Sequence, residues 1–319
     1  MSDASPSGSF GRHRKIMPFD PASEAALRAA SREKAASLNQ HVLGYGALAE
    51  AEWAAAGIAA PDLPAMRRYR LDRIRAELRR RGYAGALLYD PVNIRYATDS
   101  TNMQLWVAHN PTRHCFVATD GPVVLFDYFS CEHLSDHSGV VDEVRPAVSW
   151  MYMYGGELTE MKVRRWAAGI ADLVREHGGG NARIAVDHLN PEGVAELARL
   201  GVTVGNGEAV METARLIKSP DEILAMRRAI VACEAAMGEM RAALVPGITE
   251  NALWAELHRA NIVRGGEWIE TRLLSSGPRT NPWFQECSAR IIEAGDLVAF
   301  DTDLIGPYGF CADLSRTWL

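Results

Sequence analysis

Short apolar runs alternate with stretches of helical patterning through the first two thirds of the chain. The runs are rich in aliphatic and aromatic residues and predict strands at residues 83–89, 114–118, 123–126, 183–186 and 202–204. Helical patterning predicts helices at residues 63–82, 158–177 and 192–200. The pair Asp120-Gly121 between two of these strands predicts a hairpin turn. Strands that alternate with helices predict an α/β domain.

The helix predicted at residues 63–82 is strongly basic, with the sequence RRYRLDRIRAELRRRG. Leu71, Ile74 and Leu78 are spaced by three and four residues and are expected to face a core, which leaves the arginines on a solvated face. Neither interleaved aromatic residues nor a glycine-rich element accompanies this helix. The net charge of −6 and the pI near 5.9 also argue against nucleic acid as a partner.

The N-terminal segment differs in composition from the rest of the chain. Residues 1–20 are polar and are predicted to form a flexible tail, without the apolar core of a secretory signal. Residues 21–57 are alanine-rich and predict a helical extension, interrupted near Gly44 and Gly46, that serves as scaffold or dimer contact. No stretch approaches the roughly 18 apolar residues of a membrane span, so a membrane is not an expected partner.

The number and spacing of the cysteines indicate the redox state of the compartment in which the protein is expected. There are five, an odd number without CxxC spacing, which argues against a zinc–thiolate site or a disulfide framework. Reduced thiols in a cytoplasmic protein are the simplest interpretation. We expect Cys311 to be a small buried side chain.

A second unit is predicted to begin near residue 213, which divides the chain into residues 21–212 and 213–319 without a Gly/Ser-rich linker. The sequence from Ser219 to Glu222 predicts a helix start, with a serine cap, a proline in the first turn and a capping box. The apolar stripe that follows is expected to pack this helix onto a sheet; a methionine-lined ligand groove is the alternative. The stripe consists of Ile223, Met226, Ile230, Cys233, Met237, Met240 and Leu244. A further helix is predicted from Thr249 to about Val263.

Residues 300–318, with the sequence FDTDLIGPYGFCADLSRTW, carry the candidate chemistry. Residues 297–300 and 310–318 predict two strands joined by a Gly/Pro turn, and such a hairpin would bring Asp301 or Asp303 beside Asp313. Carboxylates near an apolar core are costly unless they are paired or bound to metal. Oxygen ligands suit Mg, Mn, Fe(II) or Co. The alternative is an exposed acidic hairpin in which Asp313 pairs with Arg316, and spacing alone leaves both open.

This segment resembles the first metal-ligand hairpin of the creatinase/prolidase/methionine-aminopeptidase superfamily, the pita-bread metallohydrolases. Those proteins have an Asp, a glycine-containing turn and a second Asp followed by Ser/Thr-Arg-Thr, which matches residues 313–317 here. In peptidases the two Asp lie eleven positions apart, which would fall on Thr302; this chain has Asp301 and Asp303 on either side of it. The resemblance implies a creatinase-type N-terminal α/β domain followed by the first part of a pita-bread catalytic domain.

Within the superfamily the chain is most similar to the metallopeptidase-like dimethylsulfoniopropionate lyases. The resemblance is specific in YDPVNIRYATDSTNMQLW (Tyr89–Trp106), HNP (His109–Pro111), ARLIKSPDEILAMR (Ala214–Arg227) and RGGEWIETRLLSSGPRTNPWFQEC (Arg264–Cys287), and weak before about residue 61 and over residues 131–200. Related aminopeptidases place a Pro-His pair upstream of the metal hairpin, where this chain has Asn281-Pro282-Trp283. The missing histidine argues against amide hydrolysis, which needs a general acid or base within reach.

The resemblance implies an enzyme that converts dimethylsulfoniopropionate, a small-molecule substrate, to dimethyl sulfide and acrylate. Asp301, Asp303 and Asp313 would bind the metal, expected to be binuclear iron, with manganese, zinc or cobalt as alternatives. The remaining ligands, one His and two Glu, and the catalytic base are expected beyond Leu319, so the 319-residue chain alone is expected to be inactive.

Substrate contacts are also implied by the resemblance. Trp106 would line the pocket, where an aromatic face can hold a sulfonium cation, and Trp283 and Tyr308 could complete the cage. Structural packing is the alternative for each of the three. A homodimer is implied, because a partner's N-terminal domain often closes the active site in this superfamily.

Two other functions stay open. The first is a hydrolase of the same fold, either an Xaa-Pro dipeptidase or a creatinase-like C–N metallohydrolase. The second is a degenerate, non-catalytic relative that serves as a binding or scaffold subunit. Intact Asp301, Asp303 and Asp313 speak against the second, because unused carboxylates near a core are a liability.

Overall fold

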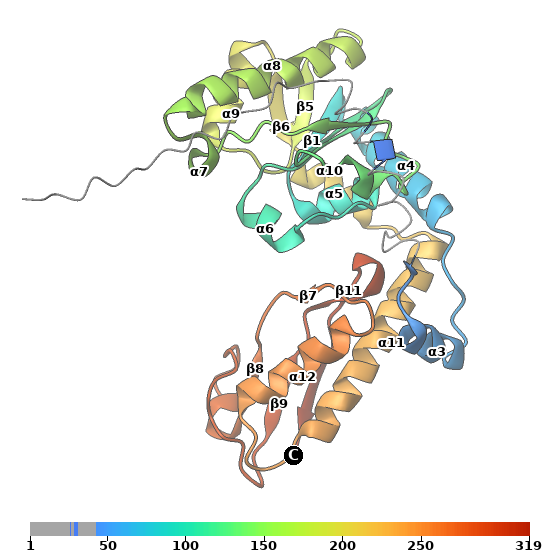
Figure 1. Ribbon diagram of the computed structural model, residues 1–319, viewed down its shortest axis with the longest axis vertical. Helices are drawn as coiled ribbons and strands as arrows, with labels where there is room; N and C mark the ends of the chain where they lie inside the picture. Colours follow the sequence, from blue (N-terminus) through green and yellow to red (C-terminus); the bar gives the residue numbers. More distant parts are fainter. Residues whose placement is uncertain (1–25, 27–28, 31–42) are drawn as a thin grey trace, which may run out of the picture.

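The computed structural model describes residues 26, 29–30 and 43–319, in which two α/β units lie end to end (Figure 1). The predicted tail at residues 1–20, and most of the predicted extension up to residue 42, lie outside the described residues. The extension is described from Leu43 onward. Gly44 and Gly46 have φ of 74° and 89° and separate Leu43 from helix α3 (Ala47–Ala55), which confirms the predicted interruption.

The N-terminal unit is built on a six-stranded mixed sheet with the order β4-β3-β2-β1-β5-β6. Its strands are β1 (Gly85–Leu88), β2 (His114–Ala118), β3 (Val123–Asp127), β4 (Glu143–Pro146), β5 (Arg183–Val186) and β6 (Thr203–Asn206). Strands β1, β2 and β3 pair antiparallel, whereas β5 pairs parallel with β1 and β6, and β4 pairs parallel with β3. All five strands predicted in this unit are present, and the turn at Asp120-Gly121 joins β2 to β3.

Helices cover both faces of this sheet. Its longer helices are α4 (Leu63–Arg81), α5 (Pro91–Thr98), α8 (Thr159–His177), α9 (Pro191–Arg199) and α10 (Glu208–Arg215); its short ones are α6 (Gln104–His109), α7 (Tyr152–Gly155), η1 (Glu132–Ser135) and η2 (Gly156–Leu158). Successive strand residues face opposite sides, so Leu87 packs against α8 and α9, and Leu88 packs against α4, α5 and α10. Leu71, Ile74 and Leu78 of α4 are buried in the second core, as their spacing predicts.

The second unit consists of α11 (Pro220–Ala243) and α12 (Glu250–Ile262) packed on short strands. One three-stranded sheet has the order β11-β10-β7 and the other β12-β9-β8. Their elements are β7 (Trp268–Ile269), β8 (Leu274–Ser276), η3 (Gly277–Thr280), β9 (Val298–Asp301), β10 (Leu304–Ile305), η4 (Pro307–Gly309), β11 (Cys311–Ala312) and β12 (Ser315–Trp318). Ser219 and Glu222 form the predicted capping box, and Thr249 caps α12.

The apolar stripe predicted for α11 packs on the core of this unit from Ile230 onward. Ile223 is 45% exposed, and the buried residues of the first turns are Glu222, Ala225, Arg228 and Ala229. The reason is that the first half of α11 does not face the sheet. It packs instead on α3 and α4, where Ala225 shares a cluster with Trp53. Figure 1 shows α3 lying alongside α11.

The strand predicted at residues 310–318 is broken into two. Strand β12 pairs with β9, with Ser315 opposite Asp301, and β11 pairs with β10, with Ala312 opposite Leu304. Asp303 has φ of 38°, so the chain leaves extended geometry between β9 and β10. The prediction that the Cys311 side chain is buried is wrong. Cys311 is exposed, because it lies on the edge strand of its sheet beside a cavity.

Among the described residues, no helix is both long enough and apolar enough to cross a membrane.

Candidate metal centre

The break in the hairpin brings three carboxylates together. Asp301 ends β9, Asp303 lies between β9 and β10, and Asp313 lies between β11 and β12. One ligand oxygen from each of the three lies within 4.8 Å of the others. Asp301 and Asp303 are half-buried and Asp313 is exposed. The predicted convergence is therefore confirmed, although the strand is not regular at Asp303.

Thr302 holds the two strands together where the ladder is interrupted. Its side chain is fully buried, on the side of the strand opposite its two Asp neighbours. Its hydroxyl donates to the carbonyl oxygen of Ala312 at 2.9 Å and accepts from the amide of Leu314 at 2.8 Å. The hydroxyl therefore replaces backbone hydrogen bonds that the ladder lacks at this point. The position at which peptidase spacing would place a carboxylate serves here as a cross-strand clamp.

Asp303 is held from the loop before β8. Its Oδ2 accepts from the hydroxyl of Thr271 at 2.6 Å, and its carbonyl oxygen accepts from the amide of Glu270 at 2.9 Å. The backbone of Asp301 is held nearby, because its amide donates to the carbonyl oxygen of Leu273 at 3.0 Å. Two of the three carboxylates thus project from anchored backbone.

The electrostatics of the cluster fit a cation. Burial, and then the neighbouring carboxylates of Asp313 and Asp303, raises the pKa of Asp301 to about 6. Asp301 Oδ1 is buried and has no hydrogen-bond partner among the described residues. A divalent ion would remove the repulsion and give this oxygen a partner.

The alternative pairing of Asp313 with Arg316 is not formed. Arg316 Nη1 donates to the carbonyl oxygen of Ser315, and within residues 43–319 no ion pair joins Arg316 to Asp313. The three oxygen donors therefore suit a hard or borderline divalent cation.

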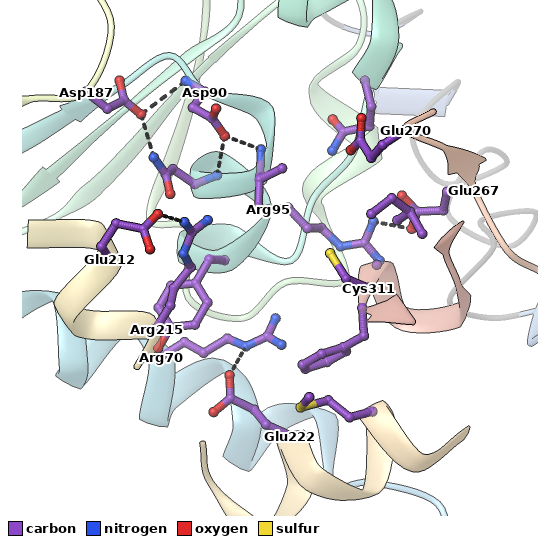
Figure 2. A pocket seen from close by; sticks show the side chains of 18 of the residues that line it. Arg70, Asp90, Arg95, Asp187, Glu212, Arg215, Glu222, Glu267, Glu270 and Cys311 are labelled. Atoms are coloured by element: carbon purple, nitrogen blue, oxygen red, sulfur yellow. Dashed lines mark hydrogen bonds and ion pairs between the residues drawn. The ribbon is translucent and has the colours of Figure 1, made fainter. Parts of the chain in front are cut away.

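A cavity of about 660 Å³ lies between the two units, next to this hairpin (Figure 2). Arg70 of α4 pairs across it with Glu222 of α11 at 2.8 Å, and Arg95 of α5 pairs with Glu267 at 2.6 Å. Glu270 and Cys311 also line the cavity. None of the three aspartates lines the cavity, but Glu270 adjoins Thr271, which donates to Asp303, so the cavity lies near the carboxylate cluster.

The cavity lining carries more negative than positive charge. Its seven acidic residues are Asp90, Asp187, Glu208, Glu212, Glu222, Glu267 and Glu270. Its four arginine and lysine residues are Arg70, Arg95, Arg215 and Lys218. Seven minus four leaves a formal excess of three negative charges with His188 neutral, so the lining favours a cationic group over an anion.

The three predicted substrate contacts lie in separate places. Trp106 is in α6 with 44% of its surface exposed, and Trp283 is partly buried in the loop after η3. Tyr308 is buried between Tyr45 and Trp53 of the extension, and its hydroxyl accepts from Arg228 Nη1 at 2.9 Å. None of the three is among the described residues that line the cavity. Their contact with substrate stays a prediction.

The residues that sequence reasoning missed are the ionic pairs of the cavity. Arg95 and Glu267 lie 172 positions apart, and no local pattern marks them as partners. The available signal was that both fall inside stretches of specific family resemblance, Tyr89–Trp106 and Arg264–Cys287. Their pairing depends on how the two units dock.

Comparison with known proteins agrees with this architecture. The Creatinase/Prolidase N-terminal domain matches residues 70–217, and Metallopeptidase family M24 matches residues 224–319. The chain belongs to metallopeptidase family M24, with a creatinase-type N-terminal domain, and both the predicted family and the predicted fold class are confirmed.

Its relatives within the family include two lyases. It is 49% identical over 285 residues to dimethylsulfoniopropionate lyase DddP of Roseovarius nubinhibens, with 88% of this chain and 64% of the relative covered. It is 45% identical over 314 residues to the lyase of the same name from Roseobacter denitrificans, with 97% and 69% covered. The chain thus spans about two thirds of the length of these curated relatives.

Solved structures support the fold alone. The Xaa-Pro dipeptidase from Bacillus anthracis is 19% identical with a TM-score of 0.61, over 78% of this chain and 63% of that one. Dipeptidase PepE from Mycobacterium ulcerans is 22% identical with a TM-score of 0.57, over 82% and 66%. At these identities the likeness shows a shared architecture and no shared substrate.

Proposed function

We propose that the protein is a metal-dependent lyase that cleaves dimethylsulfoniopropionate to dimethyl sulfide and acrylate. The observation that carries this proposal is the 45–49% identity to two lyases of that name over 88–97% of the chain. Peptidase relatives are less identical and match a smaller part of the chain. The uncharacterized peptidase YqhT of Bacillus subtilis is 28% identical over 44% of this chain. The shared sequence includes both units.

The metal in this proposal is a divalent cation held by Asp301, Asp303 and Asp313. Iron in a binuclear site is the specific proposal, with manganese, zinc or cobalt as alternatives. When bound, the metal supplies positive charge that binds the substrate carboxylate and makes the adjacent C–H bond more acidic. The close carboxylates and the unpartnered oxygen of Asp301 support this assignment.

The cavity beside the cluster is the proposed substrate site. Its excess of carboxylates favours the positively charged sulfonium group, while the metal end takes the carboxylate. In the elimination, a proton leaves the carbon next to the carboxylate, the C–S bond breaks, and sulfur keeps the electron pair and departs as neutral dimethyl sulfide. We assign the base to no residue of this chain. Aromatic contacts from Trp106, Trp283 and Tyr308 stay part of the proposal.

The proposal is tested by release of dimethyl sulfide. Headspace gas chromatography is applied to the natural protein, loaded with Fe²⁺ without oxygen and supplied with dimethylsulfoniopropionate. Metal-dependent release is expected, and Asp313→Asn should abolish it. Asp120→Asn, in an exposed turn of the N-terminal unit, is the matched control and should leave it unchanged. Absence of dimethyl sulfide from metal-loaded protein contradicts the lyase.

An Xaa-Pro dipeptidase or creatinase-like C–N hydrolase is the second candidate, favoured by the M24 match itself. Trp283 stands where related aminopeptidases have histidine, which opposes it. Hydrolysis of an Xaa-Pro dipeptide without dimethyl sulfide release would establish it. A non-catalytic scaffold is the third candidate, and unchanged biological function after Asn replaces all three aspartates would favour it.

We also propose a cytoplasmic homodimer, without nucleic acid or membrane as partner. Exposed apolar side chains of α6, α7 and the start of α8 support a protein contact, among them Trp106, Tyr152, Met153 and Met161 at 44%, 78%, 57% and 58% exposure. Such a concentration of exposed apolar surface is typical of an interface. Sedimentation equilibrium tests the homodimer.

A further inference from the structure

The turn that joins β10 to β11, between Asp303 and Asp313, lies against three arginines from three different helices. It spans Pro307–Phe310, so it begins four residues after Asp303 and ends three residues before Asp313. Tyr308 contacts Arg228 of α11, Gly309 contacts Arg95 of α5, and Phe310 contacts Arg70 of α4. Strand β11, at the end of this turn, lies on the side of its unit that faces the N-terminal unit (Figure 1).

Tyr308 is the most tightly fixed residue of the turn. Its φ of 64° lies in the left-handed region, which a tyrosine adopts only where its surroundings impose it. Its amide donates to the hydroxyl of Tyr45 at 3.2 Å, and the two ring centroids lie 4.4 Å apart. Its hydroxyl accepts from Arg228 at 2.9 Å.

Arg228 is in turn fixed by the N-terminal extension. Its guanidinium lies 4.4 Å from the ring centroid of Trp53, and the Nε1 of Trp53 donates to its carbonyl oxygen at 2.9 Å. It also donates to the carbonyl oxygens of Ala59 and Ile58. Trp53 is fully buried, so this contact is part of a packed interior. The extension therefore reaches Tyr308 by two routes, directly through Tyr45 and through Arg228.

The N-terminal unit contacts Gly309 and Phe310 of the turn. A Cβ on Gly309 would lie 3.2 Å from the Cζ of Arg95, and Gly309 has φ of 69°, so the turn fits closely against that guanidinium. Arg95 is itself held by Asp99 at 3.1 Å and by Glu267 at 2.6 Å. The ring centroid of Phe310 lies 5.0 Å from the guanidinium of Arg70.

The hairpin has few contacts of its own with which to fix this turn. Strands β10 and β11 share only two residue pairs, Leu304 with Ala312 and Ile305 with Cys311. Short ladders of this kind are weakly stable without further packing. Asp303 immediately precedes β10 and Asp313 immediately follows β11, so the geometry of the turn affects their separation.

We propose that the N-terminal unit and the extension position the metal ligands through this turn. In this arrangement Tyr308 and Arg228 are positioning residues, which hold Asp303 and Asp313 at the separation the metal requires. The inference rests on the metal centre proposed above and is independent of the lyase substrate. It also gives Tyr308 a different role from the substrate contact that the sequence predicts.

The test compares two Tyr→Phe variants with the same local chemistry. Tyr308→Phe removes the hydroxyl that accepts from Arg228. Tyr83→Phe is the matched control, because Tyr83 is equally buried at 6% exposure and also accepts from an arginine, Arg183, at 3.2 Å, on the N-terminal unit. The natural protein and its variants are titrated with Mn²⁺, and the electron paramagnetic resonance signal of free Mn²⁺ gives the dissociation constant.

We expect Tyr308→Phe to raise the Mn²⁺ dissociation constant about tenfold, the lower end of the loss typical when groups that support metal ligands are removed. Tyr83→Phe should leave it within about twofold, which corresponds to less than one hydrogen bond's contribution. The visible absorption spectrum of bound Co²⁺ should shift in Tyr308→Phe and stay unchanged in Tyr83→Phe, because it reports ligand geometry rather than stability.

A second variant guards against a folding defect. Tyr45→Phe removes the acceptor of the Tyr308 amide without touching Arg228, and should weaken Mn²⁺ in the same direction. If both variants are folded by circular dichroism and bind Mn²⁺ as the unaltered chain does, the positioning role is overturned. If the unaltered natural protein binds no Mn²⁺, both the metal centre and the positioning role are contradicted. If the Mn²⁺ pattern holds but no dimethyl sulfide is released, the lyase alone is contradicted.

Discussion

The hydroxyl of Thr302 donates to the carbonyl oxygen of Ala312 at 2.9 Å, across the point where the hairpin ladder is interrupted. The hydroxyl oxygen of Thr302 also accepts from the amide of Leu314 at 2.8 Å. One side chain thus satisfies two backbone groups, one on either side of Asp313. Because both groups lie near a core, removing the hydroxyl leaves them without a hydrogen-bond partner and lowers the stability of the fold.

Thr302→Val keeps the size of this side chain and removes its hydroxyl. We expect it to lower the free energy of unfolding by about 1–3 kcal/mol, because a buried carbonyl and a half-buried amide lose their partner. Thr302→Ser keeps the hydroxyl and should retain most of the stability. Urea unfolding followed by circular dichroism measures both. Equal losses in the two variants would show that the methyl group, rather than the hydroxyl, stabilises the hairpin.

Metal should stabilise the native chain through its three aspartates. Mn²⁺ binds only the folded state in this prediction, so the melting temperature rises with Mn²⁺ concentration. The triple variant Asp301→Asn, Asp303→Asn, Asp313→Asn should lose that rise. Without metal it should melt at the same temperature as the unaltered chain or higher, because the repulsion between the carboxylates is gone. Differential scanning calorimetry with and without Mn²⁺ checks both statements, with Asp120→Asn as the control.

We expect the buried His114 to lower the stability of the folded chain in mild acid. It is buried between the rings of Tyr89 and Phe126, with centroids at 4.8 and 4.4 Å, and burial lowers its pKa to about 4. Its Nδ1 bonds the carbonyl oxygen of Thr112 at 2.8 Å, whereas Nε2 has no partner among the described residues. A proton on Nε2 would therefore place an unpaired charge in the core.

The sign follows from the two protonation states. The unfolded histidine has a pKa near 6.5 and the folded one a lower pKa, so the contribution of His114 to stability is complete above pH 6.5. It is lost as the pH falls towards 4, by up to about 3 kcal/mol in total. Urea unfolding at pH 7.5 and pH 5 measures the loss. His114→Phe keeps a stacked ring and should show a smaller difference between the two pH values; an equal difference would assign the loss to other groups.

The buried pair of Arg113 and Asp127 should be costly to break on one side. Both side chains have 0% exposure and their contact is 2.8 Å. Arg113→Met leaves an uncompensated carboxylate and should cost about 3–5 kcal/mol of unfolding free energy. Adding Asp127→Asn to that variant removes the charge and should restore part of the loss. A double variant less stable than Arg113→Met would contradict this account.

The sequence by itself determined the local elements. Strands at residues 114–118 and 183–186 follow directly from apolar runs, and the start of α11 follows from the capping box of Ser219 and Glu222. These signals involve residues at most a few positions apart, so backbone propensity and capping decide them without the rest of the fold. The convergence of Asp301 and Asp303 with Asp313 was also within reach, because one short hairpin connects them.

The tertiary structure alone decided which surfaces meet. The first half of α11 buries Ala225 and Arg228 against the extension, and Tyr308 packs there rather than in a substrate cage. Arg95 and Glu267 border one cavity from opposite units. Such contacts depend on how separate units dock, and a helical period shows that a face is apolar without showing what covers it. Thr302 combines both levels: its place between two aspartates is plain in the sequence, and its clamp on Ala312 exists only because the folded strands meet there.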